Sequence, residues 1–353
     1  MIEKNEYYTS LPAVGLLNLN KKKKKKKKKK KNICNNLKLY NACYINSSIQ
    51  CLFHLDKFIN KIVNCSIEGN LTKATKNLIY NMKNNNQYLK LSVLEIKEAM
   101  VDLDEKYNDN QQEDANEFIS DYLNLLIEET RIKNDNLMNL INFNNSKYED
   151  EYLHFINKFY KKGSSFISEL FDGILRTENF CKKCNLTFSI KYHPFNILNL
   201  PLCNLIKKYK KKPLEMNDIF EQFILEKKIS NRICPKCKKE IYTKTDIYKF
   251  PYYLILYFGR NDGNYYIENK INNLNQINLT NFLYQKDNLE NINYNLKGVI
   301  YYYSFHKKSG HYSASSLINN RWYYFDDDYI EDSEKMAEYE NENLIIAFYE
   351  KNN

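Results

Sequence analysis

The amino-acid sequence predicts an α+β fold. From Leu55 to Thr130 the residue pattern is mostly helical, whereas β-type segments dominate the chain after Thr243. Two Cys-x-x-Cys pairs lie between these regions. With 353 residues, the chain is long enough for a large core in one multi-lobed domain or two. We therefore expect a helical lobe, a β lobe, and a β extension inserted between them.

A cysteine stands at the start of the first predicted helix. Small residues precede Cys43, and an amphipathic run with apolar residues at helical spacing follows it from Ile45 to Phe53. The unpaired N–H groups and positive dipole end of a helix favour a thiolate over a thiol, and the thiolate is the nucleophile. Cys43 is therefore a candidate nucleophile. The alternative is a small buried cysteine that packs the helix into the core.

A candidate base and its orienting group lie near the C-terminus. Residues 309–314 are typical of a strand and include His311, and an Asn-Asn turn separates them from an aromatic strand at 321–328 that ends in carboxylates. The two strands would form a hairpin that places an aspartate beside the histidine. His311 would then take the proton from Cys43, and Asp326 would hold the imidazole in its tautomer and orientation.

These motifs resemble those of a known family. The sequence Asn-Ala-Cys-Tyr-Ile-Asn-Ser-Ser-Ile-Gln-Cys-Leu at 41–52, with Gly-His-Tyr at 310–312 and Trp-Tyr-Tyr-Phe-Asp-Asp at 322–327, resembles the cysteine and histidine boxes of ubiquitin-specific proteases. The resemblance extends from about Gly15 to Phe348, with the motifs in the family's order. It implies a papain-like cysteine protease with a helical thumb, a β palm and zinc-tipped β fingers. The implied reaction is hydrolysis of the thioester, ester, peptide or isopeptide bond after the C-terminal glycine of ubiquitin.

The resemblance also implies a division of the chain. We expect an N-terminal tail, a catalytic domain, and an Asn-rich, poorly periodic connector ahead of the fingers. The predicted ranges are 1–14 for the tail, 15–350 for the catalytic domain, 15–20 and 41–145 for the thumb, 21–40 for a Lys-rich insertion, 134–162 for the connector, 166–250 for the fingers and 251–350 for the palm. Within the palm, residues 250–260, 294–301 and 343–349 are predicted strands.

One family residue is separated from its usual place. The family's cysteine box opens with Gly-Leu-x-Asn-Leu-Gly directly before Asn-Thr-Cys-Tyr, and here an insertion divides the two halves. The resemblance implies that Asn18 is the asparagine whose amide stabilises the oxyanion of the tetrahedral intermediate. Direct counting back from the cysteine instead gives Lys38, and this alternative stays open.

A second motif precedes a predicted helix. The sequence from Gln111 to Ile119 has an acidic opening followed by an apolar face, which is typical of a helix start with capping carboxylates. It also resembles the family's Gln-Asp box. That resemblance implies that Gln112 and Asp114, with Tyr312 of the histidine box, bind the C-terminal tail of the substrate.

The two Cys-x-x-Cys pairs predict a metal site. Cys181, Cys184, Cys234 and Cys237 would supply four thiolates to one tetrahedral zinc ion, which leaves no open position and makes the site structural. Free thiols on two unrelated hairpins are the alternative. An odd number of cysteines, nine in all, and no recognisable secretory signal also argue against disulfides. The proposed mechanism needs no catalytic cofactor.

The charge of the chain is concentrated in one segment. The net charge is +10, and removing the eleven lysines at 21–31 leaves −1. The run could contact acidic surfaces, RNA or an import receptor, although compositional drift also explains it in a chain rich in Asn and Lys. A nucleic-acid partner is therefore not expected.

The remaining expectations concern location and partners. We expect an intracellular protein, cytoplasmic or nuclear, without a membrane span, whose partners are ubiquitin, ubiquitinated proteins and a regulatory protein. Two departures from the family pattern are Asn116 and Tyr302, which stand where histidine occurs in relatives. A ubiquitin-binding scaffold without turnover and a zinc-ribbon nucleic-acid-binding protein are the alternatives.

Overall fold

A computed structural model describes most of the chain. The described residues are 10–18, 41–67, 69–84, 89–108, 111–132, 149–161, 163–203, 205, 212–261, 266–284, 291–306, 309–333 and 338–352. Lys38 and the lysine run lie outside them. The chain divides into two compact units, one formed by 1–130 and 297–347 and the other by 131–296 and 348–353. The predicted limits of thumb, fingers and palm stay predictions.

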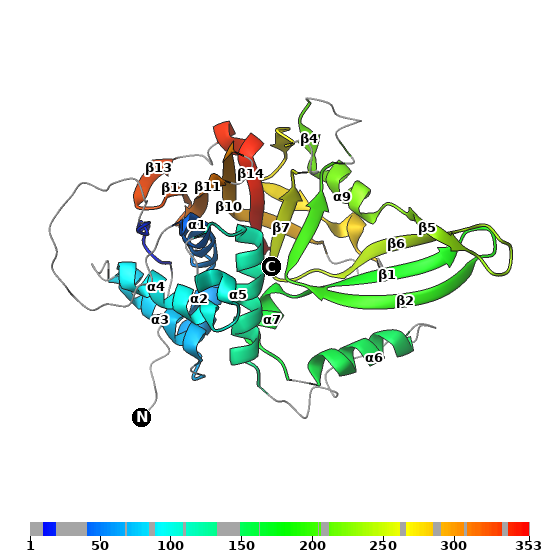
Figure 1. Ribbon diagram of the computed structural model, residues 1–353, viewed down its shortest axis with the longest axis horizontal. Coiled ribbons are helices and arrows are strands. Elements are labelled where there is room, and N and C mark those ends of the chain that lie inside the picture. The colour runs from blue at the N-terminus through cyan, green and yellow to red at the C-terminus, as the bar shows by residue number, and fades with distance from the viewer. Residues whose placement is uncertain are drawn as a thin grey trace. The chain divides into compact units, whose positions relative to one another are not determined.

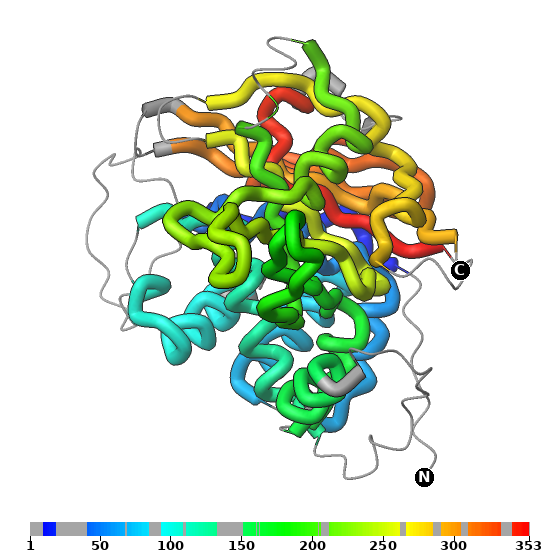
Figure 2. The backbone as a smooth tube through the Cα atoms, turned by 90° about the vertical axis from the view of Figure 1, so that its right-hand side faces the viewer, coloured from blue at the N-terminus to red at the C-terminus, as the bar shows by residue number. Residues whose placement is uncertain are grey.

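The first unit is helical in its N-terminal part, as the sequence predicts. Figure 1 shows these helices together, and Figure 2 shows the blue and cyan helical tubes of this part of the chain; α3 packs against α2, α4 and α5. Their apolar faces are buried, so tertiary packing stabilises each helix beyond its intrinsic propensity. The elements are α1 (Cys43–Leu52), α2 (Asp56–Val63), α3 (Asn70–Lys83), α4 (Leu89–Val101), η1 (Glu105–Asn108) and α5 (Ala115–Glu129).

The helix α1 is buried on its polar face as well as on its apolar face. All ten of its residues are buried, because α5 and the strands β11 and β12 pack around it. Its polar side chains therefore need partners within the protein. Gln50 donates from Nε2 to the carbonyl of Val14, and Ser48 donates to the carbonyl of Tyr44. The helix that carries Cys43 is thus held rigidly on every side.

The C-terminal part of the first unit is an antiparallel sheet. Its order is β13-β12-β11-β10-β14, and β10 and β14 continue into the second unit. Asn319 and Asn320 have φ angles of 48° and 63°, as a tight hairpin turn requires, so the predicted hairpin of β11 and β12 is confirmed. The strands are β10 (Asn293–His306), β11 (Ser309–Ile318), β12 (Arg321–Asp326), β13 (Tyr329–Ser333) and β14 (Leu344–Lys351), with η4 (Glu338–Asn343) before the last.

The second unit contains a long four-stranded antiparallel sheet in the order β2-β1-β6-β5 (Figure 1). A parallel pair of β3 and β7 and smaller elements complete the unit. The predicted strands at 250–260, 294–301 and 343–349 are β7, β10 and β14. The further elements are α6 (Glu149–Tyr160), α7 (Phe166–Phe171), β1 (Gly173–Cys181), β2 (Leu186–Phe195), β3 (Ile197–Pro201), β4 (Leu214–Glu215), α9 (Met216–Ile224), β5 (Lys227–Ile233), β6 (Glu240–Lys249), β7 (Tyr253–Gly259), β8 (Ile271–Asn272), β9 (Gln276–Asn278) and η3 (Thr280–Phe282).

The connector predicted at 134–162 is not irregular throughout. Residues 149–160 form α6, which packs on the four-stranded sheet through Tyr152, Phe155 and Ile156. These apolar side chains recur at helical spacing within an Asn-rich background that masks the pattern. The rest of the connector, apart from residue 161, lies outside the described residues.

The structure also bears on membrane insertion. Within the described ranges, no helix has both the length and the apolar character that crossing a bilayer requires.

Candidate active site

Cys43 occupies the first position of α1. Its side chain has 2% exposure. The preceding residue, Ala42, donates its backbone N–H to Asn18 Oδ1 at 3.1 Å. Gln112 Nε2 donates to Cys43 Sγ at 3.0 Å. The cysteine therefore sits at the positive end of a helix and accepts a hydrogen bond at its sulfur.

The histidine and its carboxylate lie on neighbouring strands. His311 is on β11 and Asp326 ends β12, and His311 Nε2 lies 2.5 Å from Asp326 Oδ1. Hydrogen bonding to Asp326, and then to Cys43, raises the pKa of His311 to about 10. Because Nε2 faces the carboxylate, Nδ1 is the ring nitrogen left for the sulfur. The structure thus brings together the three residues that the sequence suggests as nucleophile, base and orienting group.

Gln112 links the cysteine to the histidine strand. In addition to its contact with Cys43, its Oε1 accepts a hydrogen bond from the backbone N–H of Gly310 at 3.1 Å. Gly310 directly precedes His311, so one side chain holds the nucleophile and the base-bearing strand at once. The resemblance implies that this motif packs near the cysteine and that Gln112 contacts the substrate. Its direct contact with the sulfur is visible only in the folded chain.

Asp114 caps a helix, which is the ordinary explanation that the sequence offered for its carboxylate. It is the N-cap of α5, and its Oδ1 accepts from the backbone N–H groups of Asn116 at 2.7 Å and Glu117 at 3.4 Å. Burial raises the pKa of Asp114, and these two hydrogen bonds oppose the rise. A substrate contact by Asp114 stays a prediction.

A second aspartate, which the sequence analysis missed, joins three segments beside Cys43. Asp327 accepts from Asn18 Nδ2 at 2.9 Å and from Asn46 Nδ2 at 2.8 Å. Its backbone carbonyl accepts from the N–H of Leu16 at 2.9 Å. Burial raises the pKa of Asp327, while the two amide donors lower it. The Asp-Asp-Asp run at 326–328 could have pointed to this aspartate, but such a run is also typical of a solvated turn.

Two tyrosines flank the histidine. Tyr302 and Tyr312 lie opposite each other on β10 and β11, with ring centroids 4.8 Å apart. Tyr312 is buried, and this burial raises the pKa of its phenol. Burial also raises the pKa of Tyr302, with further contributions from the nearby Asp114 and Cys43. The two rings therefore form an aromatic wall close to the nucleophile.

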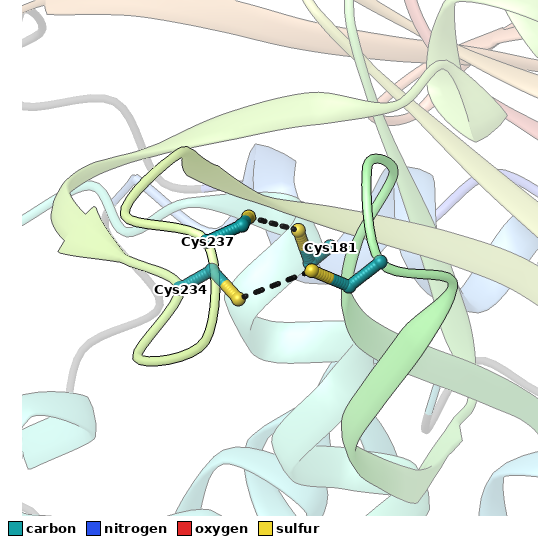
Figure 3. Close-up of side chains that lie close together, drawn as sticks. Cys181, Cys234 and Cys237 are labelled. Carbon is teal, nitrogen blue, oxygen red and sulfur yellow. Dashed lines mark hydrogen bonds between the residues drawn. The ribbon is translucent and has the colours of Figure 1, made fainter.

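The four cysteines of the second unit form one cluster. Cys181 ends β1, and Cys234 follows the last residue of β5 (Figure 3). The sulfur atoms of Cys181 and Cys237 are 3.5 Å apart, and those of Cys184 and Cys234 are 3.9 Å apart. All four lie within 4.8 Å of one another, close enough to hold a metal ion.

The turn around the second pair also supports ligation. Backbone N–H groups of Cys237 and Lys236 donate to the Cys234 sulfur and lower the pKa of its thiol to about 7. The turn is closed by a hydrogen bond from Lys238 N–H to the carbonyl of Cys234. Such N–H donors favour the thiolate form that metals bind.

Comparison with known proteins agrees with these motifs and this fold. A family model described as ubiquitin carboxyl-terminal hydrolase matches residues 34–349. The chain belongs to the ubiquitin carboxyl-terminal hydrolase family. The resemblance to ubiquitin-specific proteases that the sequence analysis found is therefore confirmed.

Members of this family among curated proteins are similar over part of their length. Ubiquitin carboxyl-terminal hydrolase Usp2 of Drosophila melanogaster is 27% identical over 247 residues, which cover 65% of this chain and 25% of the fly protein. Ubiquitin carboxyl-terminal hydrolase 7 of Saccharomyces cerevisiae is 26% identical over 262 residues, or 65% of this chain and 22% of the yeast protein. The chain thus spans about a quarter of the length of these relatives.

Solved structures in the family share the fold. The SAGA Ubp8/Sgf11/Sus1/Sgf73 DUB module bound to ubiquitin aldehyde contains a chain that matches with a TM-score of 0.68 and 16% identity. The match covers 97% of this chain and 70% of that chain. A structure of the Ubp8-Sgf11-Sgf73-Sus1 module gives a TM-score of 0.65 at 17% identity, with 97% and 68% covered. The predicted α+β class and papain-like architecture agree with these neighbours.

Proposed function

We propose that this chain is a deubiquitinating cysteine protease that hydrolyses the bond after the C-terminal glycine of ubiquitin. The observation that carries the proposal is the arrangement of Cys43, His311 and Asp326 in one hydrogen-bonded group at a helix N-terminus. Membership of the ubiquitin carboxyl-terminal hydrolase family supports the choice of ubiquitin as the modifier. The proposed bonds are the thioester, ester, peptide and isopeptide bonds to that glycine.

The proposed chemistry follows from the positions of these groups. The Cys43 thiolate attacks the carbonyl carbon of the glycine, and the protonated His311 gives its proton to the leaving amine as the carbon–nitrogen bond breaks. Water, deprotonated by His311, then attacks the thioester and releases a carboxylate and the Cys43 thiol. Asp326 holds the imidazole throughout. Asn18 and backbone N–H groups near Cys43 stabilise the oxyanion in both steps.

Zinc is the metal that we propose for the four-cysteine cluster. A tetrahedral ion with Zn–S bonds of about 2.3 Å places its sulfur ligands roughly 3.8 Å apart. The sulfur separations of 3.5 Å for Cys181–Cys237 and 3.9 Å for Cys184–Cys234 are close to that spacing. Cys181, Cys184, Cys234 and Cys237 would fill every ligand position, so the ion would join the turns after β1 and β5 and take no part in the reaction.

The proposed partners follow from the family and its solved members. Ubiquitin and ubiquitinated proteins are the proposed substrates, and a regulatory protein is a proposed partner because the matching structures carry Ubp8 together with Sgf11, Sus1 and Sgf73. We place the protein in the cytoplasm or nucleus, where thiols stay reduced.

A ubiquitin-binding scaffold without turnover is the second candidate, and one observation favours it. Asn18 already donates its amide to Asp327 at 2.9 Å, and a segment from 19 to 40 separates it from the cysteine motif. If that donor does not reach the oxyanion, the site would bind ubiquitin but react slowly.

The deciding experiment is intact-mass analysis after mixing the protein with ubiquitin whose C-terminus carries a thiol-reactive electrophile. A competent enzyme gives one covalent adduct, which Cys43→Ala abolishes and His311→Ala slows. Cys65→Ser, which changes a cysteine far from the site in sequence, serves as the matched control and retains the adduct. Binding of unmodified ubiquitin without any adduct would favour the scaffold.

A further inference from the structure

The four-stranded sheet of the second unit has one edge beside a helix. In the order β2-β1-β6-β5, β2 is a terminal strand, and no other described strand pairs with its outer side. Pro194 lies in β2 opposite Ile174 of β1. Because proline lacks an N–H, it is tolerated in edge strands where that position faces away from the neighbouring strand. The presence of Pro194 therefore indicates that the backbone groups at this position face away from β1.

This direction identifies which backbone groups face outward. Backbone N–H and C=O groups of an antiparallel strand alternate between its two sides, so Tyr192 and Ile190 share the orientation of Pro194. Their backbone groups point away from β1, toward the open side of the sheet. The edge thus offers the donors and acceptors that an added strand would pair with.

A groove of about 870 Å³ runs along the same edge. Its lining includes the four consecutive β2 residues 190–193. Successive side chains of a strand point to opposite faces, so a groove that contacts four in a row follows the edge of the strand and not one face. Figure 1 shows α6 running alongside β2, and Phe155 and Phe159 of α6 form the opposite wall.

The wall is held in place by aromatic packing. The ring centroid of Phe155 is 6.0 Å from that of Tyr192. Phe155 also stacks on Phe159, with a centroid distance of 5.5 Å. Tyr152 packs between Tyr192, at 5.2 Å, and Tyr248, at 4.6 Å. The groove is therefore preformed and apolar along α6, which lowers the entropy that an occupant must lose on binding.

The rim of the groove is basic. Its lining includes two histidines and three basic side chains, Arg131, Lys158 and Lys191. Glu151 is the one acidic side chain among the lining residues. Lys191 lies on the face of β2 opposite Tyr192. An occupant that pairs with β2 would thus place alternate side chains against the aromatic wall and against the basic side. Such a strand would alternate apolar and acidic residues.

We propose that the edge of β2 and the groove beside α6 bind an extended segment of a partner protein in which apolar and acidic residues alternate. The segment adds as a strand to β2 and its backbone pairs with Ile190 and Tyr192. Its apolar side chains contact Phe155 and Phe159, and its carboxylates meet the basic rim of Arg131, Lys158 and Lys191. This binding does not depend on the Cys43 chemistry.

A defined peptide tests the proposal on the full chain. The probe is a fluorescein-labelled peptide of about ten residues that alternates glutamate with valine or phenylalanine, followed by fluorescence anisotropy. We expect saturable binding that weakens at least about tenfold in the double variant Lys158→Glu/Lys191→Glu, and equally when alternate backbone amides of the peptide are N-methylated. Lys227→Glu, an exposed lysine of the opposite edge strand β5, is the matched control and retains binding.

Several results would overturn the proposal. They are absence of binding, equal binding of a peptide with lysine in place of glutamate, and equal binding of the N-methylated peptide. Loss of binding in Lys227→Glu would move the site to the other edge. Displacement of the probe by excess ubiquitin would assign the groove to the substrate surface instead of a separate partner. A photo-crosslinker on the peptide should label residues 155–159 or 190–193, and labelling elsewhere would also contradict the assignment.

Discussion

Asn18 and Asp327 lie 309 residues apart in the sequence and are joined by a hydrogen bond of 2.9 Å from Asn18 Nδ2 to Asp327 Oδ2. The other carboxylate oxygen of Asp327 accepts from Asn46, on α1. One side chain therefore fixes the segment that carries Asn18, the helix that carries Cys43, and the end of the strand that carries Asp326. Asp327 positions these groups and itself contacts neither the sulfur nor the imidazole in any described hydrogen bond.

The first prediction concerns this aspartate. Asp327→Ala should lower kcat by about 10- to 100-fold with little change in KM, because the segment that carries Asn18 and the helix that carries Cys43 lose the side chain that joins them. The measurement is hydrolysis of a fluorogenic ubiquitin C-terminal amide. Asp328→Ala, which changes an exposed neighbour, is the control and should leave kcat unchanged. An equal effect of the two substitutions would contradict the positioning role.

A second prediction concerns Gly310. A Cβ at this position would lie 2.4 Å from the ring of Tyr302, so Gly310→Ala must shift either the ring or the strand that carries His311. Overpacking of this kind costs about 1–3 kcal/mol of stability. We expect a lower melting temperature and slower adduct formation, with partial recovery in Gly310→Ala/Tyr302→Ala. At Gly259 a Cβ would lie 3.5 Å from Pro201 and 3.7 Å from Leu200, which are ordinary contact distances, so Gly259→Ala is the tolerated control.

The third prediction concerns the protonation of His311. Its pKa is raised to about 10, chiefly by the Asp326 hydrogen bond. In the folded protein the imidazole therefore stays protonated at pH values well above its ordinary pKa of 6.5. The resulting stabilisation is fully present below pH 6.5 and is lost as the pH rises through about 10. NMR of labelled histidine should show His311 charged at neutral pH. Asp326→Ala should bring its titration toward neutral pH, whereas Asp332→Ala on β13 should not.

Acid sensitivity is the fourth prediction. His54 is buried, donates from Nδ1 to the Gln50 carbonyl at 2.5 Å, and stacks on Phe325. Burial lowers its pKa from 6.5 to about 4, so the folded state stays neutral while the unfolded chain becomes protonated below pH 6.5. The free energy of unfolding should fall by up to about 3 kcal/mol as the pH drops from 6.5 to 4.

Urea denaturation at several pH values measures this effect. His54→Phe keeps the stacked ring and removes the titrating group, so the part of the pH slope between 6.5 and 4 should become shallower. His154→Gln, at an exposed position of α6, should leave the slope as it is. A slope that His54→Phe does not alter would show that other groups cause the acid sensitivity.

The last prediction concerns the four-cysteine cluster. The purified protein should contain one zinc ion per chain, and Cys181→Ser should lower the zinc content toward zero because it removes one of four ligands. Chelation should then expose the turns after β1 and β5 to limited proteolysis. Cys65→Ser is the control and should retain the full zinc content. Retention of zinc in Cys181→Ser would place the metal elsewhere.

Features that depend on local pattern could be predicted from the amino-acid sequence. Helical periodicity predicted the helices from α2 to α5, and alternation with β-type composition predicted β7, β10, β14 and the hairpin of β11 and β12. The spacing of the four cysteines predicted that they would lie together. These features are readable because a helix or strand repeats its buried face at a fixed interval along the chain.

Contacts between distant segments could not be predicted in this way, because they form only when the chain folds. The bond from Gln112 to Cys43 spans 69 residues, and that from Gly310 to Gln112 spans 198. The burial of α1 on every side and the packing of α6 on the sheet also depend on elements far away in the sequence. No local period encodes which side chain a distant backbone group will meet. That choice is made when the chain packs and each buried polar group must find a partner.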